Sequence, residues 1–183
     1  ATSDLAQEFL LEPHENGSGI RGLFYGEEGF RHFFTVKPVS GMEDLAGMKI
    51  RVSNDPIMTG MVEALGANPT VVAMGELYSA LQTGVVDAAE NNIPSFSLSR
   101  HSEVAKFFSL DEHTMVPDVL VVSTKTLDKL TPDQQQVLYT AATNSSELMK
   151  KLWAQSEAQE RASAEKAGVT FSNVDKTPFV DAV

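Results

Sequence analysis

The chain has 183 residues, 42% of them hydrophobic and 21% charged, and this composition excludes a disordered chain and a coiled coil. It has no cysteine, which excludes zinc-ribbon, iron–sulfur and thiol chemistry. Lys and Arg number 14 against 25 Asp and Glu, and the net charge of −11 argues against nucleic acid and anionic membranes as partners. No apolar run approaches the roughly 18–20 residues of a membrane span, so direct membrane insertion is not expected either.

The first two elements of the chain are predicted to be a helix and a strand. Ser3 or Asp4 can cap a helix over Ser3–Leu11, and the Pro13–Gly19 segment has the composition of a loop. Ile20–Tyr25 is a short apolar stretch typical of a strand. A lone helix and strand are an unusual start for a compact domain, which indicates truncation. The absence of a signal peptide fits a cytoplasmic protein, a processed exported protein or a fragment.

Strand-like and helix-like segments then alternate, which predicts βαβ units and a largely parallel sheet. The expected strands are Phe30–Lys37, Met48–Val52, Thr70–Ala73 and Val85–Ala89. The expected helices are the segment from Pro56 to Gly66, capped by Ser53 or Asn54, and Gly75–Gln82.

The last third of the chain holds the clearest helix signal. A helix is expected around Glu103–Phe108, and Val116–Val122 is expected to be a strand of a different sheet. Thr131, Pro132 and Gln134 then supply an N-cap, a first-turn proline and a capping box.

Helix-forming residues follow that capping box as far as Ala167, and Gly168 ends the helix. About 36 residues give a length of roughly 54 Å, longer than a small domain is wide. Its apolar face fades after Gln155, so we expect it to pack on one body and bridge to another. A strand over Val169–Phe171 is expected next.

The residues give an enzyme little support. None of the four histidines has metal-ligand spacing, and no nucleophile elbow, P-loop or dinucleotide fingerprint is present. The Asp111-Glu112-His113 run is compatible with a metal site, but a charged loop is the favoured interpretation. A catalytic triad dispersed along the chain stays an open alternative, so a small α/β enzyme acting on a carboxylate substrate is kept as a second hypothesis.

Two arginines lie inside strand-like apolar runs, Arg31 and Arg51. A salt bridge to an acidic residue, or exposure at a strand edge, would explain either one alone. Arg51, however, lies at the carboxyl end of its strand before a helix N-cap, where ligands bind in open α/β sheets. A guanidinium beside helix N-terminal N–H groups suits a carboxylate ligand.

Three further residues follow strands at positions of the same kind. Asn91 and Asn92 can exchange hydrogen bonds with hydroxyl groups, with turn asparagines as the alternative. Met74 follows the Thr70–Ala73 strand and is either a core residue or an apolar wall of the site.

The stretches GMEDLAGMKIRVSND and ALGANPTVVAMGELYSALQTGVVDAAEN, with the later KLTPDQQQVLYTAA and its long helix, strongly resemble the DctP-type solute-binding proteins of TRAP (tripartite ATP-independent periplasmic) transporters. The resemblance runs from about Gly22 to Val180. It implies a two-lobed, periplasmic-binding-protein-like α/β fold of type II kind, with mixed sheets and a long lobe-spanning helix. It implies a periplasmic protein that binds an organic acid and delivers it to the membrane permease subunits, with no catalysis, cofactor or metal.

The resemblance also implies roles for individual residues. Arg51, in the KIRV strand, would pair with the ligand carboxylate, with Arg31 helping, and Asn91 of the Glu-Asn pair would contact the ligand. Met74 takes a position that is often aromatic in the family, which puts its stacking role in doubt. The segment from Asp87 to Leu120 resembles a branch that takes uronic or related sugar acids, and there the additional expected polar contacts are Asn92, His32 and His113.

The family's chains begin with a long segment that forms most of one lobe, and this chain lacks it. We therefore expect residues 1–28 and 117–156 to be the remnant of lobe I, and residues 29–116 and 157–183 to form lobe II with the ligand-binding strand ends. A third hypothesis is a sensing or interaction module that uses one lobe only.

Overall fold

The computed structural model describes residues 3–183, and these divide into two compact units. Unit 1 comprises the residues up to Gly29 together with Pro117–Gln155, and unit 2 comprises Phe30–Val116 together with Ser156–Val183. The chain therefore passes between the units at three points of the described sequence. The assignment of the units to two lobes of a larger binding protein stays a prediction.

Unit 1 is built on a two-stranded antiparallel sheet. Its strands are β1 (Ile20–Gly26) and β7 (Asp118–Ser123), with Ile20 opposite Ser123. The pairing confirms the prediction that the late apolar strand, β7, belongs to a different sheet from the strands of unit 2. Helix α1 (Asp4–Glu15) precedes β1, capped by the Ser3 hydroxyl, and the short helix α5 (Thr124–Leu127) follows β7.

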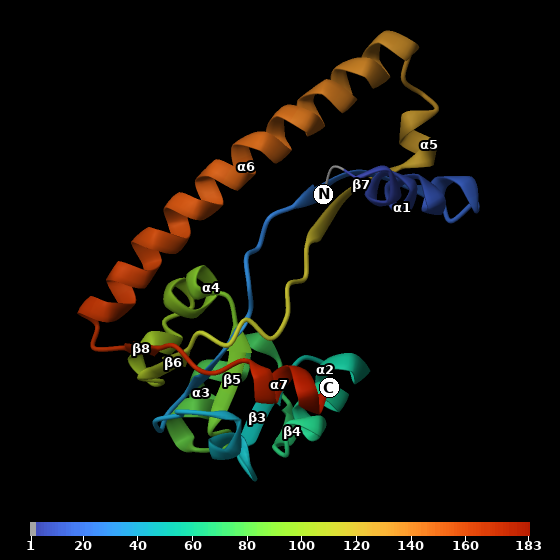
Figure 1. Ribbon diagram of the computed structural model, residues 1–183. Coiled ribbons are helices and arrows are strands. Elements are labelled where there is room, and N and C mark those ends of the chain that lie inside the picture. The colour runs from blue at the N-terminus through green and yellow to red at the C-terminus, as the bar shows by residue number, and fades with distance from the viewer. Residues whose placement is uncertain (1–2) are drawn as a thin grey trace. The chain divides into compact units, whose positions relative to one another are not determined.

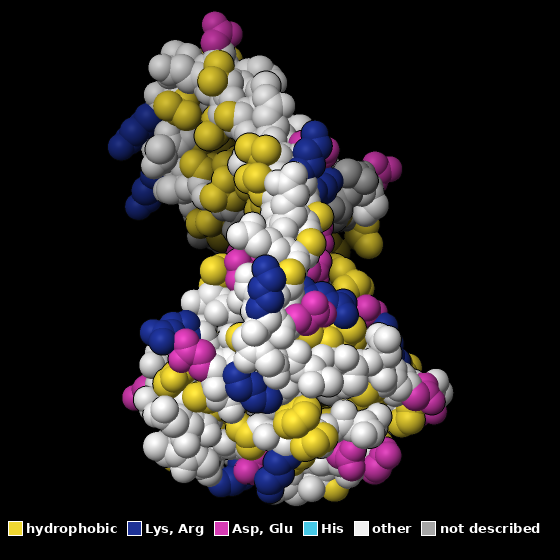
Figure 2. All heavy atoms as spheres, turned by 90° about the vertical axis from the view of Figure 1, so that its left-hand side faces the viewer, with side chains coloured by type: hydrophobic (Ala, Val, Ile, Leu, Met, Phe, Trp, Pro, Cys, Tyr) yellow, Lys and Arg dark blue, Asp and Glu magenta, His cyan; other side chains and the backbone are white. Residues whose placement is uncertain are grey.

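Unit 1 leaves much of its apolar surface exposed. Figure 2 shows hydrophobic side chains gathered on the face of this unit that is turned to the viewer. The exposed apolar residues of this unit include three consecutive residues of β7, each between 43% and 47% exposed, namely Val119, Leu120 and Val121. Further exposed apolar residues lie on its helices, namely Leu5, Phe9, Val137, Leu148 and Leu152.

Helix α6 (Pro132–Lys166) has 35 residues. Figure 1 shows it as one continuous helix. The predicted capping box is present at its start. The Gln134 N–H donates to Thr131 Oγ1 at 3.3 Å, and the Thr131 N–H donates to Gln134 Oε1 at 2.9 Å. Gly168 beyond its end has φ of 86°, a left-handed conformation that suits glycine and confirms the predicted stop.

Unit 2 contains a six-stranded mixed sheet in the order β4-β3-β5-β2-β6-β8. Its strands are β2 (His32–Thr35), β3 (Lys49–Val52), β4 (Asn68–Val71), β5 (Ala88–Asn91), β6 (Phe107–Ser109) and β8 (Thr170–Ser172). The pairings make β2 antiparallel to its two neighbours, whereas the other strands of this sheet share one direction. The predicted α/β class with a mixed sheet and a long helix is confirmed.

Helices cover both faces of that sheet (Figure 1). They are α2 (Pro56–Ala64), α3 (Leu77–Thr83), α4 (Ile93–Leu98) and α7 (Thr177–Ala182), with 3-10 turns over Met42–Leu45, Met74–Glu76 and His101–Glu103. Neighbouring strand residues enter different cores because side chains alternate between faces. Phe33 packs with residues of α2 and α7, whereas Phe34 packs with residues of α3, α4 and the end of α6.

One predicted element is wrong. The helix expected around Glu103–Phe108 is absent, and a 3-10 turn leads instead into strand β6. Phe107 and Phe108 pair with β2 on one side and β8 on the other, and Phe108 is fully buried. Pairing with two strands and burial therefore outweighed the local helical preference.

Several helix and strand boundaries also differ from those predicted. Helix α1 continues through Pro13, which was expected to end it. Strand β5 begins at Ala88 rather than Val85, and α2 is capped by Asp55 rather than by Ser53 or Asn54.

Candidate functional site

The sheet of unit 2 brings the predicted site residues to one edge. Strands β3, β5 and β6 run in the same direction, so their carboxyl ends lie at the same edge, and β2 begins there because it runs the opposite way. His32 at the start of β2 is paired with Asn91 at the end of β5. This edge, here called the carboxyl edge, holds the expected set Arg31, His32, Arg51, Met74, Asn91, Asn92 and His113.

Arg51 is buried at this edge with part of its donor capacity unused. Its side chain is only 6% exposed, and Nε donates to the Val72 carbonyl at 2.8 Å. Its terminal nitrogens have no hydrogen-bond partner among residues 3–183. Burial lowers the pKa of the guanidinium, the charge of Glu90 raises it and the charge of Arg31 lowers it, with a net decrease. Arg51 is therefore a buried cation within electrostatic reach of Glu90 and Arg31, with donors available to an anion.

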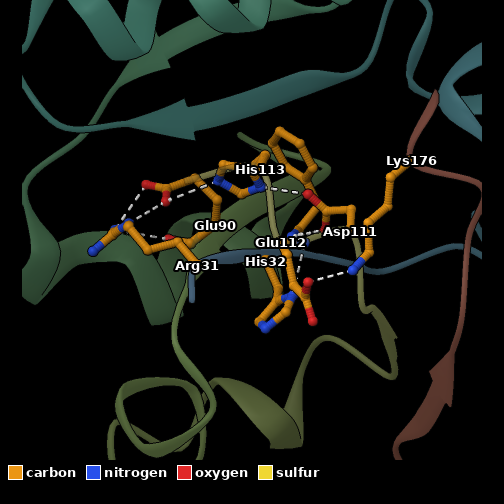
Figure 3. A network of polar contacts seen from close by, with 8 residues as sticks. Arg31, His32, Glu90, Asp111, Glu112, His113 and Lys176 are labelled. Atoms are coloured by element: carbon orange, nitrogen blue, oxygen red, sulfur yellow. Dashed lines mark hydrogen bonds and ion pairs between the residues drawn. The ribbon is translucent and has the colours of Figure 1, made fainter. Parts of the chain in front are cut away.

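Arg31 forms an ion pair with a carboxylate of the protein (Figure 3). Its Nε donates to Glu90 Oε2 at 2.5 Å and its Nη2 to Glu90 Oε1 at 2.9 Å, which is a bidentate ion pair. Nη2 also lies 3.3 Å from the Glu90 carbonyl oxygen, and the Arg31 N–H donates to the Thr114 carbonyl. Of the interpretations considered for Arg31, the structure shows the salt bridge, which is formed with Glu90.

His113 extends this ion pair into a buried ion network, defined as Arg31, Glu90, His113 and Asp111. Its Nδ1 lies 2.5 Å from Asp111 Oδ2, and its Nε2 lies 3.5 Å from Glu90 Oε2, an ion-pair contact rather than a well-formed hydrogen bond (Figure 3). Burial disfavours the imidazolium, but the two carboxylates outweigh it and raise the pKa of His113. Burial likewise raises the pKa of Glu90, and its contacts with His113 and Arg31 bring it below the ordinary value.

The ion network is tied to strand β2 through Phe33. The His113 ring stacks on Phe33 with centroids 4.3 Å apart. Asp111 is buried, and its Oδ1 accepts the backbone N–H of Phe33 at 2.9 Å. The network therefore holds the loop that contains Asp111 and His113 against strand β2.

His32 stays neutral beside this network. It is 3% exposed, and its Nδ1 accepts the backbone N–H of Glu112 at 3.2 Å. Burial lowers the pKa of His32 to about 4, although the nearby Asp111 charge opposes the decrease. Glu112 has a left-handed backbone, with φ of 52°, and its carboxylate pairs with Lys176.

The remaining predicted residues differ in how accessible they are. Asn92 is 2% exposed and caps α4, accepting the Ser95 N–H at 2.8 Å, so it fixes local structure. Asn91 Oδ1 accepts the Asn92 N–H, and its Nδ2 has no hydrogen-bond partner within the described chain. Met74 is 39% exposed at the start of a 3-10 turn.

Two acidic residues and one histidine of this edge were not predicted. Glu90 and Asp111 lie next to residues that the sequence did single out, and both are buried. The sequence could have pointed to them in one way, because a buried arginine or histidine needs an anionic partner and these two residues are acidic. His101 is also buried, and its pKa is lowered by burial and then by the charge of Arg51.

The carboxyl edge is suited to binding an anion, because the terminal nitrogens of Arg51 have no partner within the described residues. No group of three or more His, Asp or Glu side chains in residues 3–183 is placed to hold a metal ion. Within the same residues, no helix combines the length and apolar character needed to span a bilayer.

Comparisons of the sequence and of the structure with known proteins point to the same family of solute-binding proteins. Residues 2–183 match the family described as bacterial extracellular solute-binding protein, family 7, or DctP. The Salmonella typhimurium protein YiiZ is 40% identical over 90% of this chain and 51% of its own length. The chain therefore spans about half the length of this curated relative.

Two solved structures are similar to nearly the whole chain. One is a TRAP periplasmic solute-binding protein from Xanthobacter autotrophicus with bound β-D-galacturonate, 39% identical with a TM-score of 0.92, covering 98% of this chain and 60% of its own. The other is a TRAP periplasmic solute-binding protein from Pseudomonas putida F1 with bound D-glucuronate, 38% identical with a TM-score of 0.92, covering 98% and 58%.

Proposed function

Because the chain belongs to family 7 of the bacterial extracellular solute-binding proteins, the DctP family, we propose that it binds an organic acid outside the cytoplasm for a TRAP transporter. We propose a uronate or related sugar acid as the ligand, because two similar solved structures hold galacturonate and glucuronate. The protein acts in the periplasm and delivers this acid to the membrane permease subunits. It is a binding protein of a transport family and needs no catalytic group.

Arg51 is the observation that carries this proposal. Its guanidinium is buried, and its terminal nitrogens have no partner in the described chain. A guanidinium with two such nitrogens can donate two parallel hydrogen bonds to a ligand carboxylate, which is the bidentate geometry that arginine favours. Arg51 therefore binds the carboxylate of the ligand.

The other residues of the carboxyl edge divide into two groups. Asn91 donates through Nδ2 to a ligand hydroxyl, and Met74 forms an apolar wall beside the sugar ring. Arg31, Asn92, His32 and His113 support the edge through contacts within the protein. This division follows from hydrogen bonding. Arg31, Asn92, His32 and His113 have partners in the protein, whereas the terminal nitrogens of Arg51 and Nδ2 of Asn91 have none within the described residues.

The test is titration calorimetry of D-galacturonate and D-glucuronate into the full-length protein that contains this sequence. Arg51→Ala should weaken binding by about 2–5 kcal/mol, the range for truncating one partner of a buried charge pair. Arg100→Ala is the matched control, because Arg100 is exposed and pairs with Glu103 on the surface. Unchanged affinity in folded Arg51→Ala would remove the assignment, and failure of the wild-type protein to bind either uronate would remove the proposed ligand class.

A further inference from the structure

The buried charges of the carboxyl edge do not cancel. The two arginines and His113 are cationic, and Glu90 and Asp111 are anionic. Glu90 is paired with Arg31 through two hydrogen bonds, and Asp111 is paired with His113 at 2.5 Å. Arg51 is left with a backbone carbonyl as its single hydrogen-bond acceptor in residues 3–183. One positive charge is therefore uncompensated.

The excess of one positive charge depends on His113 being protonated, and the geometry around its ring supports protonation. Both ring nitrogens face carboxylate oxygens, at 2.5 Å from Asp111 and 3.5 Å from Glu90. A neutral imidazole has one N–H, so one nitrogen would direct its lone pair at an anionic oxygen. The raised pKa of His113 agrees with a doubly protonated ring.

The neighbouring ionisable groups do not alter the count. His32 Nδ1 accepts a backbone N–H, which requires an unprotonated nitrogen there, and its pKa is lowered to about 4. The pKa of the buried His101 is lowered as well. Glu112 and Lys176 pair with one another and cancel.

A site with one buried positive charge is matched by a ligand with one negative charge. Burying ions is favourable only where opposite charges are paired. One carboxylate neutralises Arg51, whereas a second carboxylate on the same small ligand would meet no free cation among the buried side chains of this edge.

We propose that this site selects monoanionic sugar acids over the corresponding dianionic acids, a uronate over an aldarate, because its buried side chains supply one uncompensated cation. The inference rests on the proposed function and refines its ligand class. Selection is by charge number, so an aldarate with one carboxylate converted to a neutral amide should regain affinity.

The experiment compares three ligands by calorimetry at neutral pH, where carboxylates are ionised. These are D-galacturonate, galactarate and the monoamide of galactarate, which has nearly the shape of galactarate but one charge fewer. The monoamide should bind at least about 30-fold more tightly than galactarate, the lower end of the effect expected for one unpaired buried charge.

Each outcome has one meaning. Equal affinity for galactarate and its monoamide overturns charge selection, and so does galacturonate binding without binding of either open-chain acid, which would indicate selection by ring shape. If galacturonate itself does not bind, the proposed function fails rather than the refinement alone.

A variant adds an independent check. Glu90→Gln removes one buried negative charge and should narrow the ratio between the monoamide and galactarate by about 10-fold or more. Glu103→Gln, an exposed carboxylate with the same change in net charge, should leave the ratio unchanged. An unchanged ratio in folded Glu90→Gln contradicts the proposal when nuclear magnetic resonance shows that His113 is still protonated. If His113 loses its proton or the variant does not fold, the wild-type ligand series decides.

Discussion

The two units of this chain differ in how well they bury their apolar residues. Unit 2 encloses two cores on the faces of a six-stranded sheet, with several phenylalanines fully buried. Unit 1 has a two-stranded sheet, and side chains of β7 remain nearly half exposed. A two-stranded sheet is at best marginally stable alone. The predicted ligand residues all belong to the better packed unit, so the site rests on the part of the chain that can hold charges in place.

The largest expected effect is the difference in stability loss between a truncation in the closed core of unit 2 and a truncation on the exposed face of unit 1. Phe34→Ala in unit 2 should lower the free energy of unfolding by about 3–5 kcal/mol, because it leaves a cavity in a closed core. Val119→Ala in unit 1 should change it by about 0.5 kcal/mol or less, since its side chain is 43% exposed. Urea denaturation followed by circular dichroism measures both. A large loss in Val119→Ala would mean that the apolar face of unit 1 is covered in the folded protein.

An intermediate effect is expected on acidification of unit 2. The pKa of His32 is about 4 when folded against about 6.5 when unfolded, so the unfolded chain binds the extra proton first. Stability from this group is fully present above pH 6.5 and falls by about 3 kcal/mol as the pH drops to about 4. His113 does not offset this loss, because its raised pKa keeps its contribution intact below about pH 6.5.

His32→Asn tests the assignment, because an amide oxygen can still accept the Glu112 N–H without titrating. Urea denaturation across this pH range should give a flatter stability curve for the variant than for the wild-type protein. Parallel curves would show that another group causes the acid sensitivity.

The smallest effect concerns the start of α6 in unit 1. Thr131→Ala removes the hydroxyl that accepts the Gln134 N–H and should cost about 1 kcal/mol. Hydrogen exchange of the first-turn amides should accelerate, while amides of the unit 2 sheet keep their rates. Faster exchange in both units would indicate that they unfold together.

Local patterns predicted the parts of this structure that depend on neighbouring residues. The capping box of Thr131 and Gln134 and the stop at Gly168 are encoded within a few positions, and both are confirmed. The strand at Phe107 and Phe108 depends on pairing with β2 and β8, so a window around these residues could not reveal it.

The same limit applies to the site. Arg31 and Arg51 were predicted because an arginine in an apolar strand is conspicuous in sequence. The partner of Arg31 was not, because Glu90 lies 59 positions away and only the pairing of β2 with β5 brings the two together. The role of each predicted residue in ligand binding remains a prediction.

The pairing of Ile20 with Ser123 also has a consequence for synthesis of the chain. Strand β1 leaves the ribosome about 100 residues before its partner, which at about 5–20 residues per second is a delay of roughly 5–20 s. The strands of unit 2, apart from β8, are synthesised within that interval. The order of synthesis therefore lets most of the unit 2 sheet form while β1 still lacks its partner. Ribosome-arrested chains ending before β7 should contain a protease-sensitive β1 beside a partly protected unit 2.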